Sequence, residues 1–89
     1  MSVPVELPDG GGDGEALAFD GEWLSCVLSR AFAPGSPVKL SLRLPKGKLA
    51  LGGKAAGSRR LKDGRFALRL RLISLRKEQR EALLRALPG

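Results

Sequence analysis

Residues 34–45 read PGSPVKLSLRLP, and this stretch decides the fold class. A Pro-Gly turn signal leads into residues 38–44, where apolar and polar side chains alternate without a break. A period of two places the valine and the leucines on one face of a strand, and Lys39, Ser41 and Arg43 on the other. One face therefore needs a hydrophobic core, and the other faces water or a charged partner.

The length and composition of the chain indicate one small domain. Its 89 residues are near the lower limit for a self-sufficient core, and the apolar share of 43% is enough to build one. We expect a cytoplasmic protein, because the sequence has no apolar run of about 18 residues and no secretory leader pattern. Cys26 is the single cysteine, which fits a reducing compartment.

The charges are distributed very unevenly along the chain. Residues 1–22 carry a net charge of −6 without any lysine or arginine, whereas residues 23–89 carry +13. A basic body favours an anionic partner, such as an acidic protein, a nucleic acid, a phosphate-bearing ligand or an anionic membrane surface. The alternative interpretation is that these charges only keep a small barrel in solution, with the acidic head lying against the basic body.

The remaining patterns predict a mainly β protein. Residues 1–14 form an acidic, glycine-rich head with a possible first strand and a flexible loop at 9–14. Strands are predicted at 15–19, 23–29, 38–44, 49–61 and 65–75, and a helix at 76–87. We expect Gly52 and Gly53 to interrupt the fourth of these strands, Ser74 to be the N-cap of the helix, and strand 65–75 to pair with strand 38–44. Residues 15–89 are thus predicted to form a small antiparallel β-barrel of five to six strands with one C-terminal α-helix.

The residue types argue against catalysis. The chain has no histidine, so it lacks the usual general base and the commonest metal ligand. Cys26 lies in an apolar strand and is interpreted as a small buried hydrophobe. We therefore predict that the protein is not an enzyme and needs no metal or cofactor.

Basic side chains supply the main candidate for an interaction surface. Lys39, Arg43, Arg69 and Arg71 would form one outward basic face if strands 38–44 and 65–75 were neighbours, and Arg59 and Arg60 form a second cluster beside a turn. Trp23, at a strand start, is a candidate partner contact, although a place in the core fits it equally well. Nucleic-acid binding stays open, but the chain has no tyrosine and few aromatic residues on which bases could stack.

From residue 16 to residue 87 the order of these elements resembles a PilZ domain, a small bacterial β-barrel with a C-terminal helix. The resemblance rests on the apolar strand WLSCVLS, the turn at residues 32–35, the strand VKLSLRLP, and then a glycine-interrupted strand, an Asp-Gly turn, the strand FALRLRLISL and the helix RKEQREALLRAL. PilZ domains are known as receptors for the second messenger cyclic di-GMP. The resemblance thus implies a role in bacterial motility, polarity or surface behaviour.

The two ligand motifs of the family are not retained. The first, Arg-x-x-x-Arg in the N-terminal segment, is missing, because residues 1–22 contain no arginine. The second, Asp/Asn-x-Ser-x-x-Gly, leaves only a remnant: Asp20 fits, Glu22 replaces the serine and Ser25 replaces the glycine. The ligand is a dianion that needs arginine donors, so we expect cyclic di-GMP binding to be lost or weak.

These observations favour a non-catalytic PilZ-like adaptor that acts through contacts with a protein partner, and an acidic partner would match its basic charge. Two alternatives stay open: a basic barrel that binds nucleic acid, and an unconventional cyclic di-GMP receptor that uses arginines such as Arg59 and Arg60.

Overall fold

The computed structural model describes residues 2–8 and 12–89. The described elements, in chain order, are β1 Val3–Glu6, β2 Asp13–Phe19, β3 Trp23–Leu28, β4 Pro37–Leu44, β5 Gly47–Arg60, β6 Phe66–Leu72 and α1 Lys77–Ala86. The predicted loop at 9–14 lies in part outside the described residues, and Asp13 and Gly14 already belong to β2. No helix of the described part is long and apolar enough to cross a membrane.

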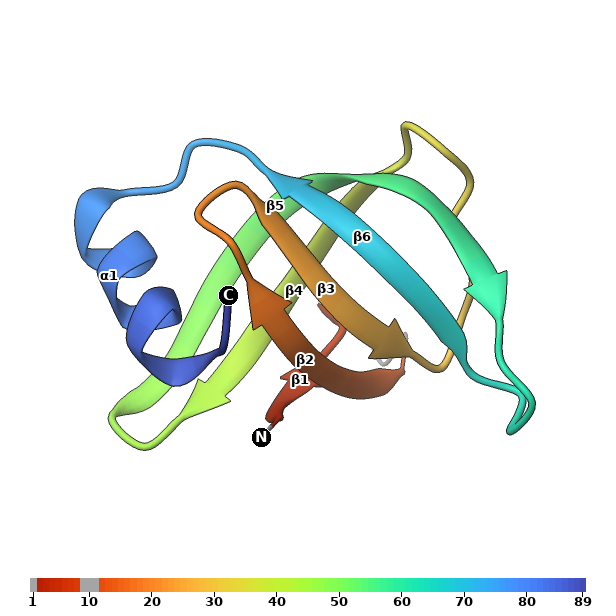
Figure 1. Ribbon diagram of the computed structural model, residues 1–89, viewed down its shortest axis with the longest axis horizontal. Coiled ribbons are helices and arrows are strands. Elements are labelled where there is room, and N and C mark those ends of the chain that lie inside the picture. The colour runs from red at the N-terminus through yellow and green to blue at the C-terminus, as the bar shows by residue number, and fades with distance from the viewer. Residues whose placement is uncertain (1, 9–11) are drawn as a thin grey trace.

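The strands form one closed barrel with the order β1-β2-β3-β6-β5-β4, and every neighbouring pair is antiparallel. Helix α1 lies at one end of this barrel, beside the β2–β3 and β4–β5 turns (Figure 1). The structure therefore confirms the predicted class: a mainly β, six-stranded antiparallel barrel with one C-terminal helix.

Strand β4 has the two faces that its alternation predicts. Val38, Leu40 and Leu42 are 2%, 2% and 0% exposed and belong to the core, whereas Lys39 and Arg43 are exposed. The inward residues of β3 behave in the same way, since Leu24, Cys26 and Leu28 are buried. The core contains no buried polar or charged side chain among the described residues.

The expected pairing of strand 65–75 with strand 38–44 is wrong. Strand β5 lies between them and pairs with β4 through residues 47–54 and with β6 through residues 53–60. The reason is the length of β5: its 14 residues are enough to pair with β4 at the N-terminal end and with β6 at the C-terminal end. Lys39 and Arg43 are therefore separated from Arg69 and Arg71 by a whole strand, so the four do not form the single basic face that was predicted.

The glycines of β5 act differently from the expectation. The strand runs without interruption through Gly52 and Gly53, and its register shift lies later, between Ala55 and Ser58. Gly57, inside this β-bulge, has φ +117°, which favours glycine. Gly53 is needed for another reason, because a Cβ there would lie 2.6 Å from the carbonyl oxygen of Arg71 in β6.

Strand β1 closes the barrel. It pairs with β2 over its whole length but with β4 through only Val5 opposite Leu42 and Glu6 opposite Ser41. Glu6 strengthens this short seam by forming ion pairs with Arg43 of β4 and, at 3.1 Å, with Lys48 of β5. The N-terminal head thus contributes a strand to the barrel, and one of its acidic side chains contacts the basic body.

Helix α1 begins later than its sequence signal indicates. Its N-cap is Arg76 rather than Ser74, whose φ of 53° belongs to the turn that leaves the barrel. The turn comes late because the ladder continues one residue past β6, where the N–H of Ile73 donates to the Gly52 carbonyl at 3.0 Å. The predicted apolar face is confirmed, since Leu83 and Leu87 are 0% and 4% exposed.

Candidate functional site

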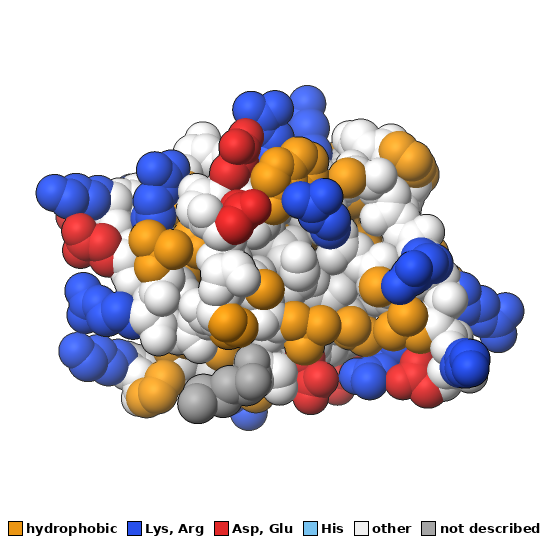
Figure 2. Space-filling view, viewed as in Figure 1, with side chains coloured by type: hydrophobic (Ala, Val, Ile, Leu, Met, Phe, Trp, Pro, Cys, Tyr) orange, Lys and Arg blue, Asp and Glu red, His pale blue; other side chains and the backbone are white. Residues whose placement is uncertain are grey.

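The most distinctive surface is the outer face of β3, β6 and β5. On β3 and β6 the ladder sets Ser25 opposite Arg69, and Val27 opposite Ala67, while Ala67 is also opposite Arg59 of β5. We call the shallow hollow on this face the outer depression; it is lined by Leu17, Ser25, Cys26, Ala56, Gly57, Ser58, Arg59, Ala67, Leu68 and Arg69. Figure 2 shows this side of the molecule, with apolar side chains lying among lysine and arginine side chains.

Two β-bulges flank the outer depression. One lies in β2 between Ala16 and Ala18, and it turns Leu17 outward so that 39% of this side chain is exposed. The other is the bulge of β5 at Ala56 and Gly57. Bulges bend a strand locally and redirect side chains, and they are common beside binding sites. Small residues form the floor between them, which leaves room for a side chain of a partner.

Trp23 and Arg69 meet at one side of this surface. The guanidinium carbon of Arg69 lies 4.8 Å from the centroid of the Trp23 ring, a cation–π geometry. Trp23 points outward on β3 and is half-buried, so the structure places it on the surface rather than in the core. Among the described residues no carboxylate forms an ion pair with Arg69. The stack thus leaves a charged group accessible beside an aromatic ring.

The remnant of the ligand motif is engaged in local structure. A carboxylate oxygen of Asp20 accepts hydrogen bonds from the N–H groups of Glu22, at 2.9 Å, and Trp23, at 2.7 Å. These two donors hold the pKa of Asp20 below its usual value of 3.8. Glu22 pairs with Arg71 at 2.8 Å, whereas Ser25 faces outward in the outer depression. Asp20 and Glu22 therefore stabilise the β2–β3 turn and its contact with β6.

The second predicted cluster is divided between two faces. Arg59 is opposite Ala67 and lines the outer depression, while Arg60 is opposite Phe66. Adjacent residues of a strand point to opposite sides, so these two guanidinium groups do not converge on one ligand. Sequence reasoning also missed Leu17, because nothing in its alternation reveals a bulge.

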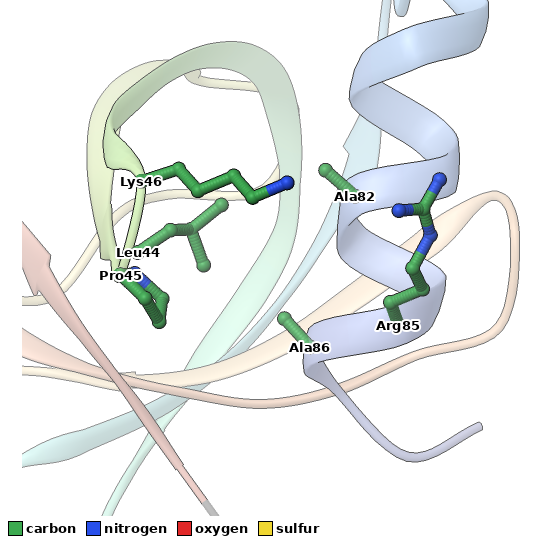
Figure 3. A pocket seen from close by; sticks show the side chains of 6 residues that line it. All are labelled: Leu44, Pro45, Lys46, Ala82, Arg85 and Ala86. Atoms are coloured by element: carbon green, nitrogen blue, oxygen red, sulfur yellow. The ribbon is translucent and has the colours of Figure 1, made fainter.

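A separate groove lies where α1 meets the β4–β5 turn. Leu44 and Pro45 of β4 and its turn face Ala82 and Ala86 of the helix, with Lys46 at the rim, and Arg85 is also among the lining residues. Figure 3 shows the amine of Lys46 reaching toward Ala82 across this opening. We call this the helix groove. Sequence reasoning did not find it, because its residues come from segments that only the closed barrel brings together.

Metal-site geometry is absent from the described part of the chain, where no group of three His, Cys, Asp or Glu side chains could hold a metal ion. Cys26 is 1% exposed, and its burial raises the pKa of the thiol to about 12. A thiol with such a pKa stays protonated at neutral pH and is a poor nucleophile.

Comparisons with models of protein families, with curated proteins and with solved structures found no match to this chain. Any assignment of function therefore has to be argued from the residues and surfaces described above.

Proposed function

We propose that this chain is a cytoplasmic, non-catalytic PilZ-like adaptor that acts through protein–protein contacts, in bacterial motility, polarity or surface behaviour as the resemblance implies. The observation that carries the proposal is the Trp23–Arg69 stack beside the outer depression. Tryptophan and arginine dominate the residues that contribute most to protein–protein binding.

The chemistry of the surrounding surface favours a protein partner with acidic groups. The outer depression offers small and apolar residues, such as Leu17 and Ala67, next to the guanidinium groups of Arg59 and Arg69. An apolar side chain of a partner fits the floor, and a neighbouring carboxylate fits the two arginines. This mixture is typical of transient interfaces, in which an apolar centre has a charged rim.

Weak or absent cyclic di-GMP binding follows from the same residues. The N-terminal segment has no arginine to grip the phosphates. Asp20 already accepts two backbone hydrogen bonds, and Glu22, which stands where the motif has serine, is paired with Arg71 at 2.8 Å and offers no donor to a phosphate. The division of Arg59 and Arg60 between two faces also argues against an unconventional receptor.

The test compares Arg69→Glu with Arg80→Glu, an exposed arginine on α1 that serves as a matched control. Both variants change the net charge equally, and circular dichroism verifies that each is folded. Proteins crosslinked to the wild type in bacterial cells are identified by mass spectrometry and then compared across the variants. We expect Arg69→Glu to lose at least one specific partner that Arg80→Glu retains.

Other outcomes would overturn the proposal. If Arg69→Glu keeps every partner, the outer face is only solvated surface. Sub-micromolar binding of cyclic di-GMP in a calorimetric titration would instead identify a receptor. Retention on DNA or RNA that falls steeply with salt, without any protein partner, would identify a nucleic-acid binder.

A further inference from the structure

The helix groove has the shape and charge of a second binding site, away from the outer face. Its floor consists of Leu44, Pro45, Ala82 and Ala86, and apolar atoms make up most of its lining. Ala82 and Ala86 are four residues apart on α1 and therefore lie on one face of the helix. Their short side chains leave open the space that a larger residue would fill, while Leu83 and Leu87 of the same helix close the barrel end.

The groove continues along the seam between β1 and β4. A neighbouring hollow shares Leu44, Pro45, Arg85 and Ala86 with it and adds Ser2, Val3, Pro4 and Arg43. The two hollows are contiguous because they share these residues, and contiguous hollows can take an extended stretch of chain.

Within the described part of the chain, every charged side chain that lines these two hollows is basic. Lys46 has no ion-pair partner among the described residues, and Arg85 approaches Glu81 only at 3.8 Å. Arg43 pairs with Glu6, but no carboxylate of residues 2–8 or 12–89 lines either hollow. Lys46 is therefore the basic group of this lining that has no carboxylate partner in the described part of the chain, and a segment with carboxylates would provide one.

We propose that the helix groove binds a short, extended segment of a partner protein, in which a leucine-type side chain is flanked by aspartate or glutamate. The apolar side chain packs against Leu44, Ala82 and Ala86, and the flanking carboxylates pair with Lys46 and Arg85. This inference does not depend on the function proposed for the outer face, because the two sites share no residue.

Fluorescence anisotropy with a labelled, end-blocked peptide of sequence GDELLDEG tests the proposal. Peptides GDESSDEG and GKKLLKKG are controls for the apolar and the acidic requirement. We expect the first peptide to bind at least tenfold more tightly than either control. We also expect Lys46→Glu and Ala86→Leu to weaken its binding at least tenfold, because the first reverses the rim charge and the second fills the floor.

Matched variants distinguish binding at the helix groove from nonspecific electrostatic binding of an acidic peptide to a basic protein. Lys77→Glu reverses an exposed charge on the same helix outside the groove, and we expect it to bind like the wild type. Equal loss in Lys77→Glu and Lys46→Glu would overturn the proposal, as would equal binding of the serine peptide or no binding of GDELLDEG. A dimer that Lys46→Glu dissociates in sedimentation would also overturn it, because the occupant would then be a second copy of the chain.

Discussion

Adding one methyl group at each of two adjacent positions of β5 should change the stability of the fold in opposite directions. At Gly53 a Cβ would lie 2.6 Å from the carbonyl oxygen of Arg71 and 3.3 Å from the Cα of Leu72. At Gly52 a Cβ would meet nothing within 4 Å. Neither glycine has a positive φ, so backbone strain does not distinguish them. Gly53→Ala and Gly52→Ala therefore form a matched pair that differs only in the clash.

The difference in stability between the two variants follows from two contributions, the entropy of the unfolded chain and the steric clash. Replacing glycine with alanine reduces the entropy of the unfolded chain, which stabilises both variants by about 0.4–1 kcal/mol and cancels in the comparison. Gly53→Ala must also move β5 or β6, because a contact of 2.6 Å to a backbone atom is shorter than real Cβ atoms allow. Overpacking of this kind costs about 1–3 kcal/mol. We expect Gly53→Ala to be less stable than Gly52→Ala by that amount.

Thermal and urea unfolding followed by far-UV circular dichroism measure this difference. For a domain of this size, 1 kcal/mol corresponds to a change in Tm of about 4–8 °C, so the expected gap is well above the error. Equal m values in urea would confirm that the denatured states match. If Gly53→Ala is as stable as Gly52→Ala, the close approach of β5 to β6 at this point is refuted.

Three further outcomes are expected. Leu42→Ala should lose about 2–5 kcal/mol in urea unfolding, because Leu42 is 0% exposed in the centre of the core; a smaller loss would contradict its place there. The raised thiol pKa of Cys26, about 12 against 9.0, means that the unfolded state releases its proton first. Stability should therefore be independent of this group below pH 9.0 and fall between pH 9.0 and about 12, by up to about 1.4 kcal/mol per pH unit, and Cys26→Ala should remove this part of the slope. The lowered pKa of Asp20 has the opposite effect on the pH dependence of stability. The stability that its carboxylate contributes is present above pH 3.8 and is lost as the pH falls through the lower folded pKa. The difference in Tm between wild type and Asp20→Ala should thus shrink in acid, and a constant difference would show that the carboxylate charge is not involved.

Local patterns predicted the strand faces and the helix but not the arrangement of the strands. The alternation at 38–44 is a property of consecutive residues, so it identified the buried side of β4 directly. Strand order depends on contacts between distant residues, and the insertion of β5 between β4 and β6 has no local signal. The prediction of one basic face was wrong for the same reason, because it assumed that β4 and β6 were neighbours.

The bulge of β5 was predicted at the wrong glycines. Gly52 and Gly53 are adjacent and conspicuous, but the register shift occurs at Ala56 and Gly57, where one glycine with a positive φ is enough. The outward position of Trp23 could not be predicted from the sequence either, since a mostly apolar strand such as β3 shows no clear alternation of apolar and polar residues. The residues of the outer depression could be named in part, but not brought together, from the sequence.

The two chain ends meet on the same strand. Val3 pairs with Ala16 of β2, and the N–H of Phe19, three positions further along β2, donates to the Pro88 carbonyl at 2.8 Å. A short linker could therefore join the ends, and new termini could be opened in the turn between β5 and β6, at residues 61–65, far from α1 (Figure 1). Such a circular permutant would keep every strand pair while moving β6 and α1 from the end of the chain to its start. In this architecture the order of the strands along the chain and the packing of the barrel are separable, so the first can be changed while the second is kept.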